Sequence, residues 1–401
     1  MLDDVSDSAT HQVPSKPPVE DCLLVVCFPH RADYTETVRK MSGDFRDGLT
    51  AQQAKRAAGQ YMTQGDPFGY DAVAEWVNSI ATETVGRKVS FCEPYAGKNF
   101  LPAAFADRFS SRFPSGIEWS GYDIAPCDDG ENLLPECNIS QADTLMSIPT
   151  KHDVIITNPP YLARNSARRR KLPFPFGYEG KGIESPADLY QIALDTCLAS
   201  ARWCAMLIPE SFITSKYDKA RLVSVISLPG DLFDDTDCPV CLALFGPDVT
   251  DDYRIYANDG NLLGTASEVR AAYDAVLRKG IAASPHGKNL TFNDPDGVLG
   301  LRGVDSSLGA LASFVPGEDI ASSRIKVSSR SITRIGIADM NGKSLGEIID
   351  AANGILMKWR KDTGDVFMTA FKGVNKKTHG YRRRLSFREA EAIVNAAIYQ
   401  N

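Results

Sequence analysis

Short apolar runs alternate with stretches of helical periodicity between about residues 88 and 246. Six of these runs predict strands, at 89–92, 119–124, 154–157, 205–208, 223–228 and 240–245. Helical spacing fills the intervals, notably over 101–109 and 189–204. Strands that alternate with helices favour a mostly parallel sheet with helices on both faces. We therefore expect a doubly wound α/β domain in this part of the chain.

The segments on either side have different patterns. Residues 1–20 are polar and contain several prolines, which predicts a disordered lead. From about 50 to 82, apolar residues recur at helical spacing around Gly65-Asp66-Pro67, so two helices joined by a turn are expected. Beyond residue 250 there are short strand patterns (253–256, 331–337) and helical ones (266–277, 345–352, 387–397). The sequence thus predicts a catalytic domain over 21–250 and a smaller α+β domain over 251–401.

Composition narrows the class of protein. The chain has 401 residues, of which 43% are hydrophobic, but no apolar run approaches the roughly 20 residues that cross a bilayer. The polar N-terminal segment lacks the features of a secretion signal, so a cytoplasmic location is expected. The odd number of nine cysteines favours free thiols. Cys238 and Cys241 have metal-site spacing but no second pair, so we expect no metal site.

Positive charge is concentrated in two places, although the net charge is −7. One cluster is Arg168, Arg169, Arg170 and Lys171. The second lies within 372–384, next to Phe371 and Tyr381, and includes Lys376, Lys377, Arg382, Arg383 and Arg384. An acidic chain with local basic clusters is compatible with phosphate contact, and an ordinary solvated surface is the alternative.

The strongest chemical signal is Asn158-Pro159-Pro160-Tyr161, which directly follows the strand predicted at 154–157. In a doubly wound sheet, ligands bind beyond the carboxyl ends of the strands. The two prolines fix the backbone and remove two N–H groups, so carbonyl oxygens are held ready to accept hydrogen bonds. The Asn158 side chain adds a further carbonyl acceptor.

Two such acceptors suit the methylation of an amino group whose lone pair is delocalised into an aromatic ring. When both N–H groups donate to the protein, the nitrogen moves toward tetrahedral geometry and its lone pair becomes available to attack a methyl sulfonium. Positioning and electrostatics supply most of this catalysis. A flat ring at Tyr161 offers a surface on which a base could stack.

A cofactor-binding pattern precedes this loop. The segment 91–100, which contains Glu93, Ala96 and Gly97, runs from a strand through a small-residue turn into a helix. Such a turn lets a ligand approach the backbone closely. Asp123 ends the next predicted strand, where an acid can bind a ribose diol, and Asp143 comes just before the strand at 154–157.

In this order, these residues resemble the amino-methylating DNA methyltransferases, specifically the gamma-type adenine-N6 enzymes of restriction-modification systems and phages. In that family a segment resembling 59–63 (GQYMT) encloses the cofactor, and segments resembling Asp188-Leu189-Tyr190 and 206–212 follow the catalytic loop. The resemblance covers about residues 55–247. Residues 251–401 would take the place of the family's target-recognition domain.

The resemblance implies a Rossmann-like fold of S-adenosylmethionine-dependent methyltransferases and a set of site residues. S-adenosylmethionine would contact Tyr61, Thr63, Glu93, Ala96, Gly97, Asp123, Ile124 and Asp143. Within the catalytic segment of Asn158, Pro159, Pro160 and Tyr161, Asn158 and Pro159 would hold the amino group of an adenine flipped out of double-stranded DNA. Tyr161 and Phe245 would stack on the base. The two basic clusters would contact the DNA. Where the family usually has a further glycine this chain has Asn99, a residue type that tolerates positive φ.

Other substrates remain open at this stage. Related loops occur in enzymes that methylate cytosine N4, guanine N2 in RNA, or glutamine in proteins, and a catalytically silent module that binds DNA or S-adenosylmethionine is a further alternative. The long segment beyond residue 247 and the segment at 59–63 favour DNA. A cognate restriction endonuclease is a candidate partner in the cytoplasm of a bacterium or phage-infected host. The recognition sequence and oligomeric state are not predicted.

Overall fold

The computed structural model describes residues 65–399 except 173, 179–185, 231, 233–238, 284–288, 327 and 378. The predicted disordered lead, the first helix predicted before residue 65, and the 59–63 segment with Tyr61 and Thr63 lie outside the described residues. Within the described part, no helix is long and apolar enough to cross a membrane.

A nine-stranded sheet forms the first unit of the molecule, in the order β3-β2-β1-β4-β5-β7-β6-β8-β9. Strands β1 to β5 pair in parallel, whereas β7 is antiparallel to both of its neighbours, β5 and β6. The strands are β1 (Val89–Glu93), β2 (Ile117–Asp123), β3 (Ile139–Gln141), β4 (His152–Thr157), β5 (Ala201–Pro209), β6 (Leu222–Ser227), β7 (Val240–Phe245), β8 (Arg254–Tyr256) and β9 (Leu262–Thr265). The predicted fold class, a doubly wound and mostly parallel α/β sheet, is confirmed.

The central strands are apolar on both faces because helices cover the sheet from both sides. Every residue of β7 and nearly every residue of β1, β4 and β5 is buried. On one face the rings of Phe91, Phe105, Phe113 and Trp119 contact one another. The helices of this unit are α3 (Asp71–Glu83), α4 (Phe100–Phe109), α5 (Arg164–Arg170) and α6 (Leu189–Ser200).

Two boundaries differ from the sequence-based expectation. The helix predicted over 189–204 ends at Ser200, and β5 begins at Ala201, because 203–208 is a continuous apolar run that periodicity cannot separate from a buried helix. Strands β8 and β9 join the large sheet, which therefore extends to Thr265, beyond the predicted domain boundary at 250.

The second unit combines helices with a small antiparallel sheet. The sheet has the order β10-β13-β11-β12, and β14 and β15 form a separate hairpin. Its elements are α7 (Ala266–Ala283), β10 (Leu290–Phe292), β11 (Leu299–Arg302), β12 (Ser313–Pro316), β13 (Ile332–Ile337), α8 (Leu345–Thr363), β14 (Thr369–Val374), β15 (Tyr381–Arg384) and α9 (Phe387–Tyr399). Leu301, Phe314, Trp359 and Ile393 belong to its separate hydrophobic core.

Helix α8 extends well past residue 352, where its end was predicted. A reciprocal pair of hydrogen bonds between Ser344 and Glu347 starts the helix, and Gly364, with a φ of 54°, ends it. The Asn353-Gly354 pair inside the helix resembles a stop signal, but no atom lies within 4 Å of the position of a Gly354 Cβ. The helix continues because its apolar face packs on α7, α9 and β12.

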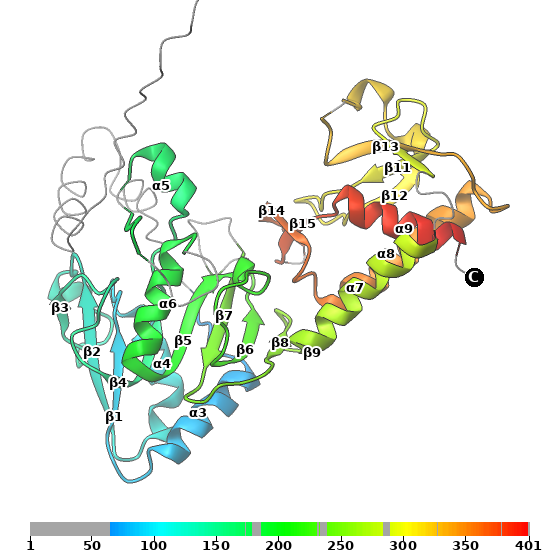
Figure 1. The fold of residues 1–401 in the computed structure, drawn as a ribbon. Coiled ribbons are helices and arrows are strands. Elements are labelled where there is room, and N and C mark those ends of the chain that lie inside the picture. Colours follow the sequence, from blue (N-terminus) through cyan, green and yellow to red (C-terminus); the bar gives the residue numbers. More distant parts are fainter. Residues whose placement is uncertain are drawn as a thin grey trace, which may run out of the picture.

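Helix α7 leads from the end of the large sheet into the second unit (Figure 1). The hairpin β14–β15 lies on the side of the second unit that faces the large sheet (Figure 1). There the Gly230 N–H, in the loop after β6, donates to the carbonyl oxygen of His379 in the hairpin turn, at 2.8 Å. The two units therefore meet at the hairpin as well as at α7.

Candidate active site

Most of the predicted site residues meet at the carboxyl edge of the parallel strands. Glu93 ends β1, Asp123 ends β2, Asn158 follows β4, and Asp143 follows β3. Parallel strands bring their carboxyl ends to one edge, where a doubly wound sheet binds its ligands. The structure thus brings together side chains that are separated by up to 65 positions in the sequence.

The Asn158 side chain is oriented by the tyrosine three residues later. The Tyr161 hydroxyl lies 2.6 Å from Asn158 Oδ1 and 2.7 Å from the Leu207 carbonyl oxygen, and it can donate to either. The ring of Tyr161 is 7% exposed and packs edge-on against Tyr190. An amide oxygen has two lone pairs, so a bond from Tyr161 is compatible with one from an amino group. Stacking of Tyr161 on a base stays a prediction.

The turn after β1 has the conformation that close approach to a ligand requires. Gly97 has a φ of 51°, and no atom lies within 4 Å of the position of an added Cβ. Asn99 also adopts the left-handed conformation, with a φ of 58°, directly before α4. Its buried amide donates to Asn132 Oδ1 at 2.9 Å and to the Cys137 carbonyl at 3.0 Å. The expectation that asparagine tolerates positive φ at this position is confirmed.

Asp123 fastens this turn to the end of β2. Its carboxylate accepts the Gly97 N–H at 2.9 Å and the Ala125 N–H at 2.8 Å. The backbone N–H of Ala96 donates to the Tyr122 carbonyl, also at 2.8 Å. An ionised carboxylate has about four acceptor positions, so these two bonds leave the chemistry of a diol acceptor intact.

Glu93 is buried, with 2% of its surface exposed, and it links β1 to β4. Its Oε1 accepts the Thr157 hydroxyl at 2.5 Å and the Tyr95 N–H at 3.1 Å. Burial raises the pKa of this carboxyl to about 8, although both hydrogen bonds oppose the shift. Because Thr157 immediately precedes Asn158, the bond holds the catalytic loop against the predicted cofactor turn. Nothing in the sequence marks Thr157 beyond its place at the strand end.

The loop after β3 contacts the same turn. Asp143 accepts the Leu145 N–H at 3.1 Å, and the neighbouring Thr144 hydroxyl donates to the Pro94 carbonyl. The carbonyl of Ile124 accepts a bond from the Gln141 amide at 3.2 Å. Asp143 and Ile124 are therefore held at the carboxyl edge, and their contacts with a cofactor stay a prediction.

Asp188, at the start of α6, supports the catalytic loop at the residue after Tyr161. Its side chain accepts the Leu162 N–H at 2.8 Å and caps α6 in a reciprocal arrangement with Gln191. Burial raises the pKa of the Asp188 carboxyl to about 6. The Asp188-Leu189-Tyr190 segment was singled out in the sequence, but its mechanical role in holding the loop was not.

Phe245, which was predicted to stack on a base, is a fully buried residue of β7. Strand β7 runs antiparallel to β5, and Phe245 pairs with Cys204 near the start of β5. Cys204 in turn pairs with Ile155 in the middle of β4, and Phe245 is fully buried at this level of the sheet. The hydrophobic pattern does not reveal this burial, and stacking of Phe245 on a base stays a prediction.

The first basic cluster is exposed beside the catalytic loop. Arg168, Arg169 and Arg170 are in the last turn of α5, and Lys171 follows with a φ of 55°. All four side chains are exposed, and the Arg168 guanidinium lies over the Phe176 ring. Figure 1 shows α5 beyond the edge of the sheet. These four residues can still contact DNA.

The second basic cluster is divided by the structure. Lys376 and Lys377 are exposed in the hairpin turn. Arg382 donates to the carbonyl oxygens of Asp305 and Lys372, and Arg384 is partly buried. Arg383 is 6% exposed and pairs with Glu210, so the prediction that it contacts DNA was wrong. A run of basic letters cannot show which side of a strand faces inward.

No metal centre is present among the residues that the structure describes, since no three His, Cys, Asp or Glu side chains group together there. The described free cysteines include Cys241, which is buried in β7. Cys238 lies outside the described residues, so the predicted role of this pair is untested.

Comparisons with known proteins give similarity in fold at low identity. No family model matches the sequence, and none of the curated proteins does. Among solved structures, a Listeria monocytogenes protein assigned to the class I S-adenosylmethionine-dependent methyltransferases is 15% identical, with a TM-score of 0.34, and the match covers 55% of this chain and 73% of that one.

Two further structures come from restriction-modification systems. The methyltransferase subunit of a type I system from Streptococcus thermophilus is 17% identical, with a TM-score of 0.35, over 53% of each chain. The type IIG restriction endonuclease BpuSI is 13% identical, with a TM-score of 0.39, over 67% of this chain and 39% of its own. This chain thus spans about half the length of the Streptococcus protein. At these scores the similarities carry no conclusion about activity.

Proposed function

We propose that this chain is an S-adenosylmethionine-dependent methyltransferase that modifies the N6 amino group of adenine in double-stranded DNA. The observation that carries the proposal is the joined edge of β1, β2 and β4. Thr157 fastens the Asn158 loop to Glu93, and Asp123 fastens the Gly97 turn to β2. An amino-group acceptor and a turn suited to a nucleoside cofactor thereby lie on neighbouring strands.

The residues of the turn fit S-adenosylmethionine. The open space at Gly97 lets a ligand approach the backbone, and Asp123 supplies a carboxylate for a ribose diol. Asp143, on the loop after β3, would contact the adenine of the cofactor. S-adenosylmethionine would supply a methyl group on a positively charged sulfur, which leaves as a neutral thioether.

The chain itself would activate the target nitrogen. Asn158 Oδ1, oriented by the Tyr161 hydroxyl, accepts one N–H of the adenine amino group, and the Pro159 carbonyl accepts the other. Both bonds draw the nitrogen lone pair out of conjugation with the ring. Positioned acceptors of this kind act without reorganising during the reaction. The proton lost from the methylated nitrogen passes to solvent.

Exposed basic groups on both units favour a nucleic acid as the substrate. The hairpin β14–β15 carries Lys376 and Lys377 on its exposed turn and touches the loop after β6 at the catalytic edge. The exposed arginines of α5 lie beside the catalytic loop. Phosphate contacts on both sides of the site would offset the cost of flipping a base, which is a few kcal/mol.

The most direct test of the modified base is expression in a bacterial host that lacks its own methylation, followed by modification-sensitive sequencing of the genome. We expect N6-methyladenine at one short motif. A genome without added methylation, or one that carries N4-methylcytosine instead, would contradict the proposal.

A further inference from the structure

Glu210 is a buried carboxylate that the chemistry proposed above does not use. It follows Pro209, the last residue of β5, and is 4% exposed. Its Oε1 accepts the Ser227 hydroxyl at the end of β6, at 2.7 Å. Leu207, whose carbonyl accepts the Tyr161 hydroxyl, is on the same strand. Glu210 therefore belongs to the edge that orients the catalytic loop.

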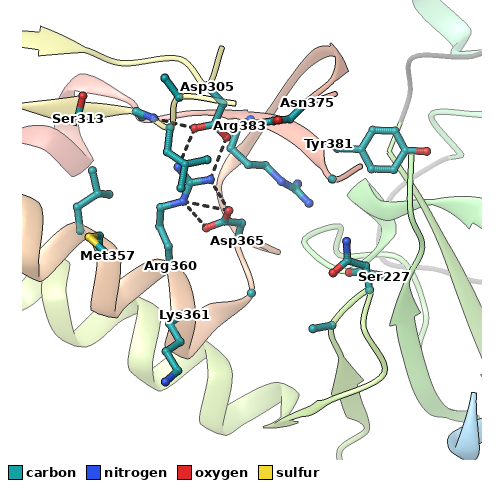
Figure 2. Close-up of a pocket in the computed structure, with 18 of the residues that line it drawn as sticks. Ser227, Asp305, Ser313, Met357, Arg360, Lys361, Asp365, Asn375, Tyr381 and Arg383 are labelled. Carbon is teal, nitrogen blue, oxygen red and sulfur yellow. Dashed lines mark hydrogen bonds and ion pairs between the residues drawn. The ribbon is translucent and has the colours of Figure 1, made fainter. Parts of the chain in front are cut away.

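Its charged partner comes from the second unit. Arg383, in β15, places Nη1 2.6 Å from Glu210 Oε2, with 7% and 4% of the two side chains exposed. Figure 2 shows the Arg383 side chain extending from the hairpin toward the segment that carries Ser227. A buried charge without its partner is costly, so each of these residues requires the other to stay in place.

The hairpin side of the ion pair is rigid. Asp305 accepts the backbone N–H of Arg383 at 2.9 Å, that of Ala312 at 2.8 Å, and the Arg360 guanidinium at 2.7 Å. Arg360 in turn bridges to Asp365 (Figure 2). These residues line a cavity of about 730 Å³ between the two units. The backbone of Arg383 is thus held within its own unit, and its side chain extends to Glu210.

A second contact lies close to the ion pair. The Gly230 N–H donates to the His379 carbonyl at 2.8 Å. A Cβ added at Gly230 would lie 2.5 Å from Val374 Cγ2 and 3.3 Å from the His379 carbonyl oxygen. A side chain at position 230 would therefore collide with Val374 and crowd the hairpin at this contact.

We propose that Glu210 and Arg383 are positioning residues whose buried ion pair sets the hairpin β14–β15 at a fixed distance from the catalytic edge. The inference rests on the proposed function for its effect on methylation, but the fixed arrangement is independent of activity. The pair would hold the exposed lysines of the hairpin turn where they engage DNA whose target base reaches Asn158.

The kinetic test uses Glu210→Gln, Arg383→Met and the double variant, in the full chain. Each single variant is expected to lower kcat/KM for DNA at least tenfold, while the Kd for S-adenosylmethionine changes less than twofold. The double variant should fall no further than the worse single variant, because the pair is lost only once. Arg383→Lys, which keeps the charge, should recover part of the loss.

Gly230→Ala tests the same interface with both charges present. It should lower kcat/KM for DNA as the single charge variants do. Glu75→Gln and Arg254→Met break an exposed ion pair within the first unit and serve as the matched control with unchanged kinetics. The inference is overturned if the single variants keep wild-type kinetics, or if their effects multiply in the double variant. A parallel loss of cofactor binding overturns it as well, since it would indicate general damage to the first unit.

A distance measurement separates this inference from the proposed function. Fluorophores on the exposed positions Asp107, in α4, and Lys358, in α8, report the spacing of the two units. We expect a narrow distribution in the wild type and a broader one in Arg383→Met and Gly230→Ala, whether or not the protein methylates DNA. Identical distributions would overturn the fixed arrangement even in an active enzyme, and an inactive wild type with the expected distributions would count against the proposed function alone.

Discussion

Glu93 makes the stability of the chain depend on pH. Its carboxyl is buried at the end of β1, and its pKa rises from an ordinary value of 4.5 to about 8. Between these values the folded chain holds a proton that the unfolded chain has released. The free energy of unfolding therefore falls as the pH rises through this window. Asp188, with a pKa of about 6, contributes the same sign over a narrower range.

Glu93→Gln should flatten this dependence, because the amide keeps an acceptor for Thr157 and Tyr95 but cannot ionise. We predict that unfolding free energies at about pH 5 and about pH 8 differ by on the order of 1–3 kcal/mol less than in the wild type. Denaturant titrations at the two pH values measure the change. An unaltered difference would show that Glu93 does not titrate in this range.

Asp153 provides a control of opposite sign. Its hydrogen bond from Arg87 holds the pKa of this carboxyl at about 2, below its usual value. The stabilisation it gives is lost only as the pH falls from about 4 toward 2. Asp153→Asn should leave the difference between about pH 5 and about pH 8 unchanged.

The positions of single site residues were predictable from the sequence where those residues lie at the end of a predicted strand. Asn158 follows a predicted strand and Asp123 ends another, so their position at the carboxyl edge could be inferred from the sequence. Arg383 and Phe245 could not be placed this way. The side of β15 that faces inward and the direction of β7 both result from contacts between segments far apart in the sequence.

At the scale of elements, the turn between β1 and α4 depends on an asparagine in a left-handed conformation. Asn99→Ala should lower the free energy of unfolding by about 1–3 kcal/mol, because alanine is strained at this φ and loses two buried hydrogen bonds. Asn99→Gly should cost less, since glycine removes the strain. Denaturant unfolding of both variants tests the order, and an alanine variant at least as stable as the glycine variant would contradict it.

Helix α5 is expected to bind DNA through its exposed arginines. Replacing Arg169 and Arg170 with alanine should weaken DNA binding and reduce the slope of log K against log salt by up to about 2, since each phosphate contact contributes about 0.9. Lys88→Ala/Arg112→Ala removes the same charge from exposed positions flanking the starts of β1 and β2. Equal salt slopes for the two double variants would contradict a specific role for α5.

Element order was predictable, and two features of the elements were not. The alternation of strand and helix gave the six main strands of the large sheet. The antiparallel course of β7 and the addition of β8 and β9 to the sheet depend on pairing partners, which period-two and helical patterns do not encode.

At the scale of the molecule, an acidic chain presents basic groups on both sides of one edge. The net charge is −7, yet α5 and the hairpin turn are exposed and positive. Figure 1 shows both next to the carboxyl edge of the large sheet. The arrangement suits a duplex held between the two units, with one base turned toward Asn158.

The central claim is that Asn158 activates an amino group of DNA for methyl transfer. The most direct measurement is the rate at which the tritiated methyl group of S-adenosylmethionine enters DNA, for the wild type and for Asn158→Ala at equal cofactor occupancy. We predict measurable transfer by the wild type and a rate at least about 100-fold lower for the variant, with the cofactor Kd unchanged. Transfer by Asn158→Ala at the wild-type rate would contradict the account.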